Sequence, residues 1–122
     1  MPRVIRFDWS ADEPERAASF YSQVFGWRVE PMQGVADYWL VTTGTAPTPG
    51  IDGGLSKRNP AAPINIWTID VPSVDEHLRK IVEHGGKDLS GKITIPRVGY
   101  HAYCQDTEGN VFAIIELDER AA

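Results

Sequence analysis

Cysteine and histidine are scarce in this chain of 122 residues. It holds one cysteine, Cys104, and three histidines, His77, His84 and His101. A single cysteine excludes an intramolecular disulfide, which favours a reducing compartment. Three histidines also leave little material for a metal centre built on imidazole ligands.

Long apolar runs and an excess of basic residues are absent as well. No segment approaches the ~20 apolar residues of a membrane span, and the first residues lack the apolar core of a secretory signal. Twelve basic residues stand against 17 acidic ones, which gives a net charge of -5. Nucleic-acid binding through a clustered basic surface is therefore disfavoured. We expect a cytoplasmic protein that binds neither membranes nor nucleic acid.

Common catalytic motifs are missing too. No HExxH, paired CxxC or GxGxxG pattern occurs. Residues 86–92 have the spacing of a phosphate-binding P-loop, but Ile93 stands where Ser or Thr should hold magnesium. This segment also follows a predicted helix and enters a predicted strand, which is the reverse of the P-loop order. The sequence therefore offers no motif that specifies a reaction.

What the chain does contain is one order of elements that occurs twice. Alternating β-formers and apolar stripes at helical spacing predict a strand, a helix and three more strands in each half. In the first half the strands are 4–9, 27–30, 38–43 and 51–57. In the second half they are 64–71, 87–95, 99–104 and 111–117. The order indicates an α+β fold of two βαβββ modules, about 3–58 and 63–117, in one domain spanning 1–122.

Capping signals mark both predicted helices. Asp12 with Glu15 three residues later has the spacing of a capping box, and Gly26 ends this first helix. Ser73 with Glu76 repeats the capping box before the second helix. We expect Asp12 and Ser73 to be the two N-caps.

Several segments together resemble the vicinal oxygen chelate superfamily, which includes glyoxalase I, extradiol dioxygenases and bleomycin-resistance proteins. They are 12–21 running into 24–27, then 69–76 with the glycine pair 85–86, and 106–112. The resemblance implies a curled, half-barrel mixed sheet with helices on its outer face and a concave cavity for a small molecule. It also implies a homodimer.

Metal-dependent members of that superfamily carry up to four ligands, commonly His and Glu. Here the matching positions hold Arg6, Ile66 and Ala113, and the remaining one falls within 53–56, beside Asp52 but without His, Asp or Glu. Arginine cannot release a proton to bind a metal, and isoleucine and alanine have no donor atom. We therefore predict no metal site and no cofactor.

Strand alternation places a few polar side chains in the predicted cavity. Arg6 and Asp8 share one strand face, as do Ile66 and Thr68, and Ala113 faces the same cavity from the last strand. The guanidinium of Arg6 either holds a ligand carboxylate or phosphate, or is neutralised by Asp8.

Four further side chains are candidates of a second kind. Tyr38, Trp39 and Tyr100 can stack on a planar ligand, or they belong to the core or a dimer interface. His101 is either a general base or a surface or hydrogen-bonded histidine.

Three functions remain open at this stage. The first is a metal-independent protein that binds an anionic or aromatic small molecule for sequestration or sensing. The second is an enzyme of the lyase, isomerase or dioxygenase type, without a metal or with unusual ligands such as Asp8, Asp52 or His101. The third is a protein-interaction module with a vestigial cavity.

Overall fold

The computed structural model describes residues 2–63 and 65–122. They form two compact units. We call residues 6–66 the N-terminal module, and residues 67–122 together with the first residues up to Ile5 the C-terminal module. Ile64, where the predicted strand 64–71 begins, lies outside the described residues. That the two modules make one domain stays a prediction.

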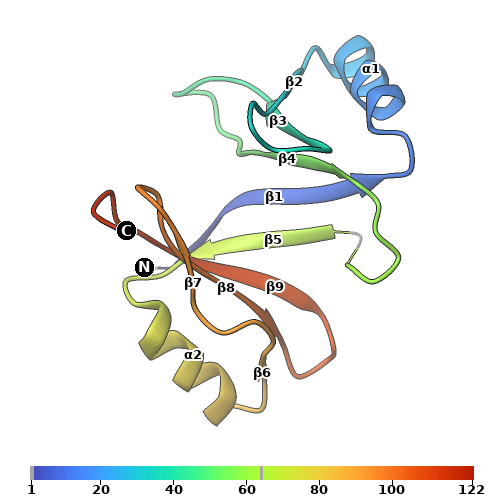
Figure 1. The fold of residues 1–122 in the computed structure, drawn as a ribbon. Coiled ribbons are helices and arrows are strands. Elements are labelled where there is room, and N and C mark those ends of the chain that lie inside the picture. Colours follow the sequence, from blue (N-terminus) through green and yellow to red (C-terminus); the bar gives the residue numbers. More distant parts are fainter. Residues whose placement is uncertain (1, 64) are drawn as a thin grey trace. The chain divides into compact units, whose positions relative to one another are not determined.

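The N-terminal module has the predicted βαβββ order. Its elements are β1 (Arg3–Ala11) from Arg6 on, α1 (Pro14–Phe25), β2 (Arg28–Pro31), β3 (Tyr38–Thr42) and β4 (Asp52–Lys57). The strands lie in the order β2-β3-β4-β1, with β1 parallel to β4 and the other pairs antiparallel (Figure 1). The parallel pair brings the first and last strands of the module side by side.

The C-terminal module repeats this plan with one difference. Its elements are β5 (Asn65–Asp70) from Trp67 on, α2 (Val74–Glu83), β6 (Lys87–Asp88), β7 (Ile93–Ile95), β8 (Gly99–Gln105) and β9 (Val111–Leu117). β5 is parallel to β9, β8 is antiparallel to β9, and both β6 and β7 pair with β8. The prediction that residues 87–95 hold one strand is wrong, because they hold two short ones, β6 and β7. Gly91 has φ 70° and donates its N–H to Asp88, so the backbone turns away from the ladder.

One of the two predicted N-caps is confirmed. Ser73 caps α2, and its hydroxyl accepts the N–H of Glu76 at 3.2 Å. The prediction of Asp12 for α1 is wrong: Pro14 begins the helix, so Glu13 is the N-cap and makes no side-chain cap. The carboxylate of Asp12 instead accepts a hydrogen bond from Arg58 at 3.2 Å. Gly26 ends α1 at φ 75°, as predicted.

Each sheet carries its helix on one face, as the alternation predicts. In the N-terminal module the rings of Trp9 and Tyr21 meet edge to face at 5.4 Å. In the C-terminal module the core lies between α2 and the strands, and comprises Val71, Val74, Ala102, Cys104 and Ile114. The chain is thus a mixed α+β fold, and within its described residues no helix is long and apolar enough to cross a membrane.

Candidate functional site

The polar face of the N-terminal sheet is the face opposite α1. Phe7 and Trp9 of β1 point toward the aromatic rings around α1, so Arg6, Asp8 and Ser10 point the other way. The register sets Asp8 beside Gly54 of β4. Polar side chains from distant parts of the chain therefore share one surface.

Arg6, Asp8 and Tyr38 form a hydrogen-bonded triad on this face. Nε and Nη2 of Arg6 donate to the two carboxylate oxygens of Asp8, each at 3.2 Å. Nη2 also donates to the hydroxyl of Tyr38 at 2.7 Å, and this hydroxyl donates to Oδ1 of Asp8 at 2.7 Å. The two charges neutralise each other, which is the second of the two roles expected for Arg6.

Gly54 is what allows the triad to close. Tyr38 lies on β3, and β4 runs between β3 and β1, so the phenol ring must cross over β4. A Cβ at residue 54 would lie closer than 3.0 Å to the hydroxyl of Tyr38 and to Oδ1 of Asp8. Only glycine leaves that path open.

The triad holds the arginine firmly charged. Burial by itself lowers the pKa of Arg6, but hydrogen bonds and charge attraction from Asp8 and Tyr38 outweigh it, so the pKa is raised. The side chains of Arg6 and Asp8 remain 35% and 31% exposed. Within the described part of the chain, Nη1 of Arg6 donates no hydrogen bond. This nitrogen is therefore available to a ligand.

The structure separates the two aromatic neighbours on β3. Tyr38 belongs to the triad, whereas Trp39 alternates to the opposite face, where its register partner is the buried Leu55. The sequence could not decide which of the two faces the polar side.

The C-terminal module brings together three of its predicted residues and separates one. Thr68 and Ala113 are register partners on β5 and β9, and both are buried. His101 pairs with Ile115 on the same face, and its ring lies edge-on against Tyr103 at 4.8 Å. Tyr100 points the other way and packs against the helix-side core. Stacking on a ligand from the Thr68 face is therefore not open to Tyr100.

The residues at the superfamily's ligand positions do not fit a divalent metal ion. Arg6 is cationic and paired, and Ile66 and Ala113 supply no donor. The two nearby acids are already engaged: Asp8 accepts from Arg6 and Tyr38, and Asp52 accepts the N–H of Thr43 at 2.9 Å. Among residues 2–63 and 65–122, no three His, Cys, Asp or Glu side chains lie close enough together to share an ion.

Two residues that shape the N-terminal module were not predicted from the sequence. Gly54 belongs to a glycine pair inside a strand, a signal for close backbone approach that was available. Arg58, at the predicted end of the first module, donates to the carbonyl of Ser10 at 3.0 Å and so joins the ends of β1 and β4. No local pattern marks such a contact, because its partner is 48 residues away.

A comparison with known protein families shows which family the chain belongs to. The family model of the glyoxalase-like domain matches residues 4–115. The chain belongs to the glyoxalase-like domain family. A glyoxylase-like domain-containing protein of Didymella fabae is 34% identical to this glyoxalase-like chain over 109 residues, which cover 85% of each sequence.

Solved structures of the glyoxalase superfamily share the fold. Methylmalonyl-CoA epimerase from Mycobacterium tuberculosis superposes with a TM-score of 0.70 at 11% identity, over 94% of this chain and 87% of the epimerase. A glyoxalase/bleomycin resistance protein/dioxygenase superfamily member from Vibrio splendidus gives 0.69 at 15% identity, over 97% and 100%. The resemblance seen in the sequence is confirmed, and at these identities it concerns the fold alone.

Proposed function

We propose that this glyoxalase-like protein binds a small molecule without a metal ion, on the polar face of its N-terminal module. The observation that carries the proposal is the triad of Arg6, Asp8 and Tyr38. Arg6 stands where the resemblance places the first metal ligand, its side chain is 35% exposed, and among the described residues its Nη1 donates no hydrogen bond. A fixed cation with an unused donor suits a carbonyl or carboxylate oxygen of a ligand.

The neutral charge of the triad limits what binds there. A second carboxylate on Nη1 would meet a guanidinium whose charge Asp8, on its Nε and Nη2 edge, already offsets in part. Ligands with one polar oxygen and an apolar or aromatic body are therefore favoured over strongly charged anions. The expected role is sequestration or sensing.

Proton transfer by the same triad is a second candidate function. The hydroxyl of Tyr38 donates to Asp8 while it accepts from Arg6. The carboxylate is placed to take the phenolic proton, and the guanidinium is placed to stabilise the oxygen that remains. A metal-free lyase or isomerase would need such a group.

A ligand screen tests the binding proposal. Purified protein, first analysed for bound zinc, nickel and iron, is screened in thermal shift against aromatic aldehydes, ketones and carboxylates. A ligand at 100 times its Kd stabilises the fold by about 2.7 kcal/mol. We expect a compound that stabilises the metal-free protein but not Arg6→Met, and that still stabilises Arg79→Met, whose arginine forms an exposed pair with Glu83 on α2. Stoichiometric metal, or equal stabilisation of both variants, would contradict the proposal.

The homodimer and the cytoplasmic location stay predictions. Light scattering of the purified protein measures its mass in solution, and a mass of one chain would contradict the dimer. Fractionation of cells that express the protein tests its location.

A further inference from the structure

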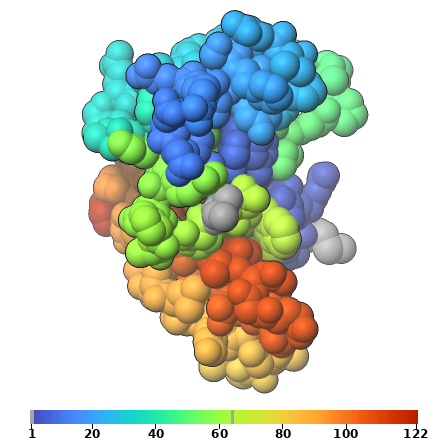
Figure 2. Space-filling model, turned by 90° about the vertical axis from the view of Figure 1, so that its right-hand side faces the viewer, coloured from blue at the N-terminus to red at the C-terminus, as the bar shows by residue number. Residues whose placement is uncertain are grey.

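A cavity of about 440 Å³ opens beside the start of α1, entirely within the N-terminal module. The cavity lies on the α1 side of the sheet. Ala11, which lines it, is on the same strand face as Trp9, whereas Asp8 and Ser10 are on the opposite face. It is therefore a different place from the triad. α1 forms part of the module's outer surface (Figure 2), so small molecules can reach this region from solvent. The volume is in the ordinary range of small-molecule sites, ~300–1,000 Å³.

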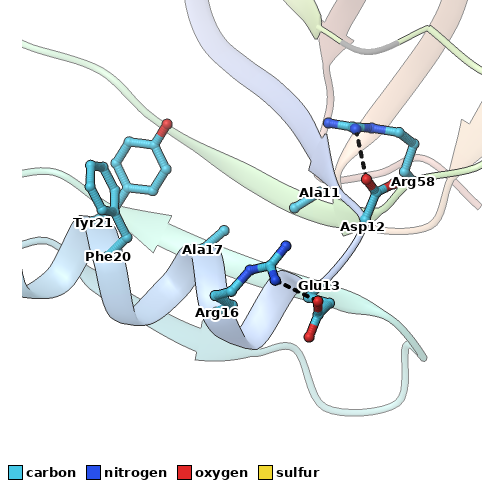
Figure 3. Close-up of a pocket in the computed structure, with 8 residues that line it drawn as sticks. All are labelled: Ala11, Asp12, Glu13, Arg16, Ala17, Phe20, Tyr21 and Arg58. Carbon is cyan, nitrogen blue, oxygen red and sulfur yellow. Dashed lines mark hydrogen bonds and ion pairs between the residues drawn. The ribbon is translucent and has the colours of Figure 1, made fainter.

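The lining divides into a charged end and an apolar end. Two arginines, Arg16 and Arg58, lie near two carboxylates, Glu13 and Asp12. The rings of Phe20 and Tyr21 lie at the far end, with small alanine side chains between the two ends (Figure 3). Both signs of charge are thus present in equal number beside an aromatic wall.

The two ion pairs at the charged end are open to exchange. Arg16 pairs with Glu13 at 2.6 Å, but these side chains are 73% and 64% exposed. Arg58 pairs with Asp12 at 3.2 Å, and the Asp12 side chain is 70% exposed. Exposed pairs of this kind contribute little to stability, so a ligand can replace them at small cost.

Arg58 differs from Arg16 because the backbone fixes it. Its Nη2 donates to the carbonyl of Ser10 at 3.0 Å, and its side chain is only 38% exposed. Nη1 is left pointing at Asp12 and is held in place for an incoming carboxylate. Asp12 then needs a new cation.

We propose that this cavity binds a zwitterionic amino acid with an apolar side chain. The carboxylate of the amino acid accepts a hydrogen bond from Nη1 of Arg58, and its ammonium group donates to the carboxylate of Asp12. Its side chain packs against Phe20 and Tyr21. A simple anion on Arg58 would lie beside the carboxylate of Asp12, and a simple cation on Asp12 would lie beside Arg58, so each would meet a like charge. The zwitterion places an opposite charge on each of the two side chains.

Calorimetric titration with three related probes tests this site. L-Phenylalanine carries both charges, 3-phenylpropanoate lacks the ammonium group, and phenethylamine lacks the carboxylate. Because the charged end is largely exposed, we expect L-phenylalanine to bind about three- to fivefold more tightly than either of the others. No binding of L-phenylalanine, or equal affinity for the three probes, would overturn the proposal.

Variants assign the binding to the cavity. Asp12→Asn, which removes one exposed carboxylate, and Arg58→Gln are each expected to weaken the binding of L-phenylalanine about three- to fivefold. The matched control is Glu30→Gln, since Glu30 forms an exposed pair with Arg28 in the same module but does not line the cavity. Thermal unfolding shows whether Arg58→Gln is folded. If Arg58→Gln is unfolded, Asp12→Asn alone decides the outcome. Unchanged affinity of Asp12→Asn for L-phenylalanine would overturn the proposal.

Discussion

Replacing Gly54 by alanine tests the triad more directly than removing any of its members. The new Cβ would lie closer than 3.0 Å to the hydroxyl of Tyr38 and to Oδ1 of Asp8. The phenol must then leave its place above β4, and its hydrogen bonds to Arg6 and Asp8 are lost. We expect a folded but less stable protein.

The size of the loss follows from the contacts. Two hydrogen bonds to charged groups contribute about 1.5–3 kcal/mol each when they are fully formed. Because the Arg6 and Asp8 side chains are about one-third exposed, water replaces part of this on their release. Strain from the extra methyl group adds about 1–3 kcal/mol if the backbone cannot move. A net loss of about 2–3 kcal/mol is therefore expected, which lowers the Tm of a 122-residue chain by about 10 °C.

Urea denaturation with two companion variants measures this effect. Gly44→Ala is the control, because a Cβ at residue 44 meets no atom within 4 Å, and it should stay within about 0.5 kcal/mol of the native protein. Tyr38→Val removes the ring that the new methyl group meets. The double variant Gly54→Ala with Tyr38→Val should therefore cost at least about 1 kcal/mol less than the sum of the single changes. Additive losses, or an unchanged midpoint in Gly54→Ala, would refute the reasoning.

Three further predictions concern other parts of the chain. Ser73→Ala removes the N-cap of α2 and should cost about 1 kcal/mol in urea denaturation, whereas Ser19→Ala, within α1, should cost less. Burial raises the pKa of Cys104 to about 11, so a disulfide reagent at pH 8 should label the thiol in urea but not in the native protein; rapid native labelling would show that the core opens. The N–H groups of Asn110 and Glu108 lower the pKa of Asp106 below its unfolded value, so its stabilising contribution is present above about pH 4 and is lost as the pH falls through the folded pKa. Asp106→Asn should therefore lose less stability than the native protein between pH 5 and pH 2, and parallel curves would contradict this.

Local signals in the sequence predicted most of the fold. Strand alternation predicted which face of β1 carries Trp9, and the capping box predicted Ser73. Both rest on interactions within a few residues of the chain. Asp12 was predicted wrongly because Pro14 moves the helix start by one residue, and the competing bond to Arg58 comes from far along the sequence.

The candidate site could be predicted only in part, because some of its contacts join residues that are far apart in the sequence. Arg6 and Asp8 are two residues apart on one strand, so their pairing follows from alternation alone. Tyr38 joins them through the register of β3 on β4 and of β4 on β1, and no local pattern fixes those registers. The cavity at α1 was missed altogether, because Arg58 reaches it through a contact across 46 residues.

The triad also explains how the fold accommodates an arginine at the position where the resemblance predicts a metal ligand. Arg6 in a half-buried place needs an anion, and Asp8 supplies it on the same strand. Tyr38 adds a second hydrogen bond to Oδ1 of Asp8, and its ring reaches that oxygen only because residue 54 is glycine. Restoring a metal ligand by Arg6→His alone would therefore leave Asp8 and Tyr38 bonded to each other, with Ile66 and Ala113 still without donors. The chemistry of this surface depends on a linked set of residues rather than on one substitution, so a change of function would require several of them to change together.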